Sequence, residues 1–302
     1  MFKNTKRKEE RVLVRAENYG ETFRVNPEYP SYGLHPLLQG AIHSLPIPED
    51  FELDISIRSR IPAGSSTGTS ASVCVALLGA LDLLTPQRHP PDEIASLAHR
   101  VETEKLGLQS GIQDQICAAY GGICFIHMYS YPEAHVLKME LEERVRQELD
   151  QRLCLIYLGK THSSSALHEE VIAFLERKGS QFKIIQRLKS LAEQAKNYLL
   201  KGDLDSFSGA MIENNECQRS LHADLISEEA DSVIQIAKEY KAAGWKVNGA
   251  GGKGGSLTIL SSGEESLSKQ MLQEINSLGK GIKSVPVSLA SSGLDVKSSN
   301  KN

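Results

Sequence analysis

The chain has 302 residues, of which 40% are hydrophobic and 24% are charged, with a formal net charge of −4. That length suits one large domain or two ordinary ones, with ample core. A mildly acidic balance gives no sign of the basic surface that marks nucleic-acid-binding proteins, so we expect no nucleic-acid partner.

Two further features bear on where the protein works. No hydrophobic run approaches the ~20 residues that a membrane crossing needs, and the basic N-terminus lacks the apolar stretch of a secretory signal. The five cysteines are odd in number and show no C-x-x-C spacing, which predicts buried free thiols. We therefore expect a cytoplasmic protein without a membrane partner.

The first half of the chain mixes strands with helices. Apolar residues alternate on both sides of a turn at residues 18–20, and again around residues 53–57, which predicts three strands. Helical spacing and start signals then predict four helices, and two further strands follow them. The helices are expected at about 35–45, 70–84, 90–101 and 112–121, and the strands at about 122–128 and 135–141.

The second half begins near Asp150 and predicts helices set against an antiparallel sheet, an α+β pattern. The order is a strand, several long amphipathic helices, two strands, a helix and a strand. We expect the strands at 152–159, 245–248, 256–260 and 282–290, the long helices between 164 and 243, and the last helix at 264–278. The polar tail from about residue 291 is expected to be disordered.

Small residues from Gly64 to Ser70 stand between a strand and a long apolar helix. Backbone N–H groups at a helix N-terminus carry partial positive charge, so a triphosphate can bind there without many lysines. A serine hydroxyl on the first turn can also reach a phosphate-bound Mg²⁺. The alternative is that Thr69 or Ser70 merely caps the helix.

A second glycine cluster, GAGGKG, runs from Gly249 to Gly254 and matches the dinucleotide pattern G-x-G-x-x-G. That pattern requires a helix directly after the last glycine, where the pyrophosphate rests. Here the segment SLTIL follows, which reads as a strand. The strand that follows the cluster therefore argues against a dinucleotide site.

Two carboxylates, Glu102 and Asp114, flank a turn downstream of the first glycine-rich loop. A kinase needs one carboxylate to hold Mg²⁺ and another near the nucleophilic hydroxyl. Taken singly, Glu102 could be a solvated charge and Asp114 an acid at a helix N-terminus. Their common position after an anion-binding loop favours the functional interpretation.

Three segments in this order resemble the motifs of the GHMP kinases. PAGSSTGTSAS is similar to P-x-x-G-L-G-S-S-A, GIQDQ to the galactokinase-type turn with the catalytic Asp, and VNGAGGKGGS to the C-terminal glycine motif. The form VETEKLGLQSGIQDQICAAYGGICFI is similar to the D-glycero-D-manno-heptose 7-phosphate kinase branch of the sugar-1-kinases. The resemblance implies a ribosomal S5 domain 2-like N-terminal domain over 1–149 and a ferredoxin-like C-terminal domain over 150–302.

The resemblance also implies roles for single residues. Asp114 would be the catalytic group at the sugar hydroxyl, and Ser70 and Glu102 would ligate Mg²⁺. His162 stands at a position that could alter sugar recognition, although a lone His in a polar turn is also compatible with a structural role. The ATP phosphates would be bound by Gly64, Ser65, Ser66, Thr67, Gly68, Thr69 and Ser70, and this loop and the substrate would be braced by Gly249, Ala250, Gly251 and Gly252.

The sequence departs from the family pattern at several points. Ser65, Ser66 and Thr67 stand where glycine or leucine is usual, and Lys253 interrupts the third motif. Nothing in residues 1–10 replaces the family's first motif, so we expect the N-terminal strands that carry it to be missing. Losing that element would remove a charge stabiliser of the transition state.

These observations predict an ATP- and Mg²⁺-dependent kinase that phosphorylates a small sugar or sugar phosphate, at the anomeric hydroxyl. One alternative is a catalytically impaired relic that still binds nucleotide or sugar. A second is a nicotinamide oxidoreductase that uses the GAGGKG segment, which would be stabilised by NAD(P) and not by Mg·ATP. The sequence predicts neither the particular sugar nor the oligomeric state.

Overall fold

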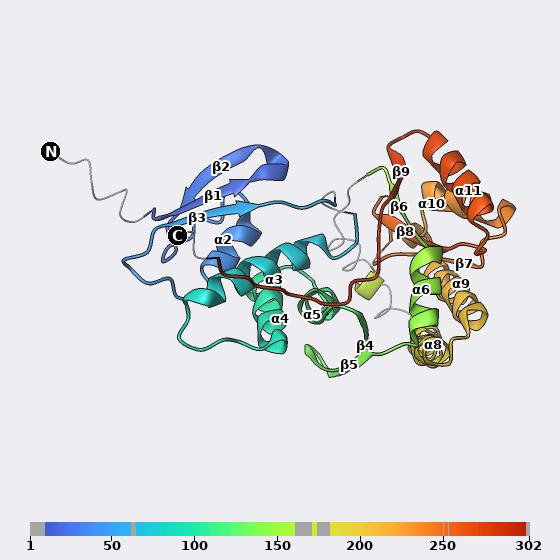
Figure 1. Ribbon diagram of the computed structural model, residues 1–302, viewed down its shortest axis with the longest axis horizontal. Coiled ribbons are helices and arrows are strands. Elements are labelled where there is room, and N and C mark those ends of the chain that lie inside the picture. The colour runs from blue at the N-terminus through green and yellow to red at the C-terminus, as the bar shows by residue number, and fades with distance from the viewer. Residues whose placement is uncertain are drawn as a thin grey trace. The chain divides into compact units, whose positions relative to one another are not determined.

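A computed structural model describes residues 10–61, 65–160, 171–173, 182–249, 251–252 and 254–299 (Figure 1). The chain forms two compact units. Unit 1 comprises residues 1–62, 68–136 and 291–302, and unit 2 comprises residues 63–67 and 137–290. The structure thus divides after residue 136, whereas the sequence predicted a boundary at 149/150.

Unit 1 is built on a three-stranded sheet in the order β2-β1-β3. Strands β1 (Val12–Ala16) and β2 (Glu21–Val25) pair antiparallel around the 3₁₀ helix Glu17–Tyr19, as the alternation predicted. Gly20 ends this helix with a φ of +66°, a conformation that glycine adopts without strain. Strand β3 (Leu53–Ile57) runs parallel to β1 after the crossover through α2 (Pro36–Ile42).

Three further helices pack with this sheet around one apolar core. They are α3 (Thr69–Leu81), α4 (Pro91–Arg100) and α5 (Gln113–Tyr120), and all three were predicted within a few residues. Fully buried Ile42, Leu78 and Ile94 join α2, α3 and α4 in that core. The 3₁₀ helix Asp82–Leu84 extends α3, and β4 (Ile123–Ser130) with β5 (Glu133–Met139) forms a two-stranded sheet.

Unit 2 contains an antiparallel sheet in the order β7-β8-β6-β9. Numbered from β6, this order is 2-3-1-4, the ferredoxin-like arrangement that was predicted. The strands are β6 (Leu153–Leu158), β7 (Gly244–Val247), β8 (Ser256–Leu260) and β9 (Ile282–Val285). The helices are α6 (Glu143–Arg152), α8 (Phe182–Lys201), α9 (Leu204–Leu221), α10 (Glu228–Glu239) and α11 (Glu265–Ser277), with a 3₁₀ turn at Ala223–Leu225.

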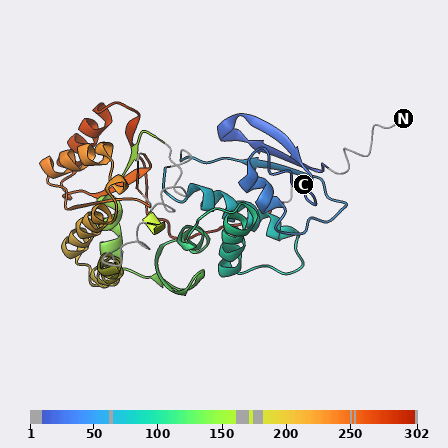
Figure 2. The ribbon, with the colours of Figure 1, turned by 180° about the vertical axis from the view of Figure 1, so that it is seen from behind.

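The helices of unit 2 cover both faces of its sheet. Trp245 and Val247 of β7 pack into an apolar core with α10 and α11. The alternate residue Gly244 faces α9, because a Cβ added there would lie 2.8 Å from the Cβ of Ser208. Helices α8 and α9 lie side by side (Figures 1 and 2). Among the described helices, none is both long and apolar enough for a membrane span.

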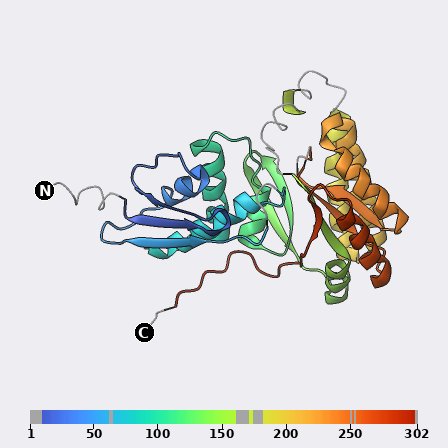
Figure 3. The same cartoon turned by 90° about the horizontal axis from the view of Figure 1, so that it is seen from above.

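Residues 291–299 correct one prediction, that the tail from about residue 291 is disordered. The segment is extended (Figure 3) and lies within unit 1. The N–H of Leu294 donates to the carbonyl of Ala119 at 3.1 Å, and a Cβ added at Gly79 would lie 2.5 Å from the Leu294 side chain. The small residue on α3 therefore provides the space in which Leu294 packs.

Candidate active site

The first glycine-rich segment enters α3 through Gly68, which is the N-cap residue with a φ of +68°. Because glycine has no side chain to cap the helix, a capping role does not explain the neighbouring hydroxyls of Thr69 and Ser70. Both occupy the first helical turn, and Ser70 is exposed. The first N–H groups of a helix have no partner within it, so this end of α3 is suited to an anion.

Asp114 lies directly against this helix N-terminus. A Cβ added at Gly68 would lie 3.2 Å from Cγ and 3.4 Å from Oδ2 of Asp114. Asp114 is itself exposed and belongs to the first turn of α5. The fold of unit 1 therefore brings Asp114 next to Gly68 of the predicted phosphate loop.

Glu102 belongs to a five-residue π-helix, Val101–Lys105, that extends α4. The π-helix is closed by the bond from the N–H of Leu106 to the carbonyl of Val101, and such bulges occur frequently at functional sites. Burial and the negative charge of Glu102 raise the pKa of the Cys74 thiol to about 12. Cys74 is one turn after Ser70 on α3, so Glu102 lies beside the helix that carries the predicted Ser70 ligand.

The Glu102 carboxylate is buried, with 6% of the residue exposed. Its Oε2 accepts two hydrogen bonds, from Ser110 Oγ at 2.5 Å and from Gln115 Nε2 at 2.8 Å. Burying an ionised carboxylate is unfavourable without such donors. The interpretation of Glu102 as a solvated surface charge is therefore wrong.

Further polar residues stabilise the turn between Glu102 and Asp114 through hydrogen bonds at Ser110. The Tyr131 hydroxyl donates to the Ser110 carbonyl at 2.9 Å, and His99 Nε2 lies 3.1 Å from both that carbonyl and the hydroxyl. His99 is 3% exposed. His99, Gln115 and Tyr131 were not predicted from the sequence, and only the position of Gln115 next to Asp114 could have indicated one of them.

The second glycine cluster is fixed by contacts within unit 2. A Cβ added at Gly249 would lie 3.5 Å from the Cβ of Ser66, which places the cluster against the predicted phosphate loop. A Cβ added at Gly251 would lie 1.9 Å from the carbonyl oxygen of Leu225. The N–H of Gly252 donates to that same carbonyl at 3.0 Å. The strand β8 that follows confirms that the cluster lacks the helix of a dinucleotide site.

The remaining predicted residues fall into two groups. Ser65 is buried, with 1% of the residue exposed, and Thr67 is half-buried. Gly64, Ala250 and His162, as well as Lys253, lie outside the described residues.

The family resemblance implies a Mg²⁺ ion, and the donor set is compatible with one. Glu102, Asp114 and Ser70 offer only oxygen, the ligand type that Mg²⁺ prefers. Within the described ranges, no group of three or more His, Cys, Asp or Glu side chains forms a complete metal cage. Mg²⁺ is usually held by one or two carboxylates together with substrate phosphates and water.

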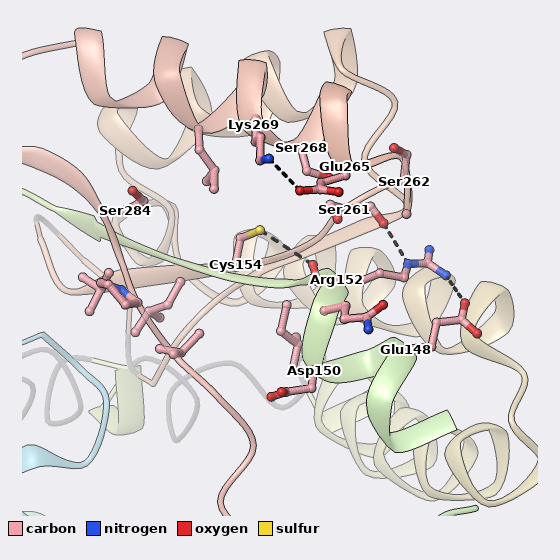
Figure 4. Close-up of a pocket in the computed structure, with 18 residues that line it drawn as sticks. Glu148, Asp150, Arg152, Cys154, Ser261, Ser262, Glu265, Ser268, Lys269 and Ser284 are labelled. Atoms are coloured by element: carbon pink, nitrogen blue, oxygen red, sulfur yellow. Dashed lines mark hydrogen bonds and ion pairs between the residues drawn. The ribbon is translucent and has the colours of Figure 1, made fainter. Parts of the chain in front are cut away.

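A cavity of about 970 Å³ lies elsewhere in unit 2, between the end of the sheet and α11 (Figure 4). Its charged walls are paired internally: Arg152 with Glu148 at 2.9 Å and Lys269 with Glu265 at 2.6 Å. Arg152 Nε also donates to the carbonyl of Ser261 at 3.0 Å. The cavity contains none of the predicted site residues.

Residues 37–122 match the family described as the GHMP kinases N terminal domain. A mevalonate kinase of Methanothermobacter thermautotrophicus is 32% identical over 206 residues, 68% of this chain and 63% of that protein. A D-glycero-alpha-D-manno-heptose 7-phosphate kinase of Campylobacter jejuni is 24% identical over 196 residues, 65% of this chain and 58% of that protein.

Solved structures show the same fold. The crystal structure of a D-glycero-D-manno-heptose 1-phosphate kinase from Bacteriodes thetaiotaomicron superposes with a TM-score of 0.71 and 21% identity, over 95% of this chain and 84% of that one. The chain spans 63% and 58% of the lengths of the two curated relatives above. Residues 37–122 thus carry a GHMP kinases N terminal domain, and over most of its length the chain has the fold of the solved kinase structure above.

Proposed function

We propose that this protein is an ATP-dependent kinase that transfers the γ-phosphoryl group of ATP to a hydroxyl of a small sugar or sugar phosphate, at the anomeric position. The observation that carries the proposal is the contact of Asp114 with Gly68 at the N-terminus of α3. A carboxylate at a phosphate-binding helix end is the arrangement that an acceptor hydroxyl needs beside a γ-phosphate. The sugar is favoured because GIQDQ is similar to the galactokinase-type turn.

In this mechanism the backbone of residues 65–70 binds the phosphates at the N-terminus of α3. Asp114 orients the acceptor hydroxyl and accepts its proton as the oxygen attacks the γ-phosphorus. The bond between that phosphorus and the β–γ bridging oxygen breaks, and ADP leaves. Mg²⁺, when bound, neutralises charge on the phosphates, and Glu102 with Ser70 would hold it.

The test is Asp114→Asn, assayed by ADP release with ATP, Mg²⁺ and a panel of heptoses, hexoses and their phosphates. We expect kcat to fall about 10²- to 10⁴-fold, because the substitution removes a positioned proton acceptor. Asp92→Asn is the matched control, since it removes an exposed carboxylate from the first turn of α4. Equal turnover of the wild type and Asp114→Asn would remove the assigned role.

Two other outcomes favour different functions. Mevalonate belongs in the panel because the similar protein of Methanothermobacter thermautotrophicus is a mevalonate kinase. Turnover of mevalonate alone would support the same mechanism but would show that the acceptor is mevalonate and not a sugar. ATP binding in a calorimetric titration, without ADP release for any acceptor, would favour the catalytically impaired relic.

A further inference from the structure

Within the described part of the chain, two buried side-chain atoms lack a hydrogen-bond partner, Oε1 of Gln115 and Oε1 of Gln218. Each glutamine donates its Nε2 to a predicted site residue. Gln115 donates to Glu102 at 2.8 Å, and Gln218 donates to the carbonyl of Gly249 at 3.1 Å. Buried polar atoms without partners are rare in folded proteins, so such an atom beside a predicted site residue indicates a place for a bound water or ion.

The orientation of the Gln115 amide is fixed by its partner. An ionised carboxylate only accepts hydrogen bonds, so Nε2, and not Oε1, is the amide atom that contacts Glu102. Ser110 Oγ donates to the same Glu102 oxygen, Oε2. Two donors on Oε2 fix the orientation of the Glu102 carboxylate.

Gln39 shows how the same unit satisfies a buried glutamine that is purely structural. Gln39 is 4% exposed and Gln115 is 1% exposed. The Oε1 of Gln39 accepts from the N–H groups of Ser31 and Tyr32, and its Nε2 donates to the Leu34 carbonyl at 2.7 Å. The unpaired Oε1 of Gln115 is therefore not the usual outcome of burying this side chain in unit 1.

We propose that Gln115 is the positioning residue of the cation site: its Nε2 holds Glu102, and its Oε1 accepts a hydrogen bond from a water molecule of the hydrated Mg²⁺. Mg²⁺ usually keeps several of its waters when protein carboxylates bind it, so a donor of this kind accompanies the ion. The inference rests on the proposed function, because the ion enters with the nucleotide.

The experiment measures Mn²⁺ affinity in the presence of ADP by electron paramagnetic resonance, with wild type, Gln115→Met and the matched control Gln39→Met. We expect Gln115→Met to weaken Mn²⁺ binding about 10- to 100-fold, the range for partners that orient metal ligands. Gln39→Met removes an equally buried amide, so it should lower the melting temperature and leave the Mn²⁺ affinity unchanged.

The outcomes separate the two proposals. Wild type that binds no Mn²⁺ with ADP overturns the proposed function and this inference with it. Wild type that binds Mn²⁺ with the same affinity as Gln115→Met overturns this inference alone. If Gln115→Met does not fold, the side-chain amide signal of Gln115 in selectively ¹⁵N-labelled wild type decides. It should shift when Mg·ADP is added and not with ADP and a chelator, and an unchanged signal overturns the inference.

Discussion

Gly68→Ala tests the contact between the predicted phosphate loop and Asp114. Gly68 has a φ of +68°, which costs a residue with a Cβ about 1 to 2 kcal/mol. The added Cβ would also lie 3.2 Å from Asp114 Cγ and 3.3 Å from its Cβ, tighter than ordinary contact, so Asp114 must move by a few tenths of an ångström. Gly20→Ala is the matched control, because Gly20 has a φ of +66° and nothing within 4 Å of an added Cβ.

The two variants should therefore share a stability loss and differ in catalysis. We expect both to lose about 1 to 2 kcal/mol in urea denaturation. Gly68→Ala should in addition lose about 10- to 100-fold in kcat, because misplacing a catalytic group by up to 1 Å can cost that much. Gly20→Ala should keep wild-type kcat. Equal kcat for the two variants, measured on folded protein, would refute the reasoning.

Two further predictions concern stability. Burial lowers the pKa of Lys246 to about 8 from the 10.5 of a free lysine, so between these values the unfolded chain binds more protons and stability should rise with pH. Lys246→Met should accordingly be more stable than wild type by about 3 kcal/mol at pH 7, with the difference shrinking towards pH 10.5 in urea titrations; a constant difference would contradict the burial argument. Leu294→Ala should cost about 1 to 2 kcal/mol, because Leu294 packs over Gly79 and is only half-buried. The exposed Val296→Ala serves as its control in the same denaturation assay, and an equal loss in both would show that the segment does not pack as described.

Most of the fold could be predicted because its elements carry strong local patterns. The alternation in β1, β2 and β3 and the apolar run of α3 are visible in the sequence. Helix α6 was missed because ERVRQELDQR has only two buried apolar residues, Val145 and Leu149, spaced four apart. Because most side chains of this helix are polar, its helical periodicity is too weak to be recognised in the sequence alone.

The residue types of the candidate site could be predicted from the sequence, but the hydrogen bonds that hold these residues in place could not. The motifs indicated Glu102 and Asp114, but the burial of Glu102 depends on donors eight and thirteen residues later in the chain. The π-helix that contains Glu102 is defined by backbone hydrogen bonds, and side-chain periodicity carries no signal for it. Nor does the sequence show that Leu294 returns to α3, because that contact joins distant segments.

The most direct measurement is a crystal structure with Mn²⁺ and a non-hydrolysable ATP analogue, with the ion located by anomalous scattering. The account predicts the phosphates at the backbone of residues 65–70 and the Mn²⁺ signal beside Glu102. Phosphates bound away from the N-terminus of α3, or an ion that neither Glu102 nor Asp114 approaches, would contradict it.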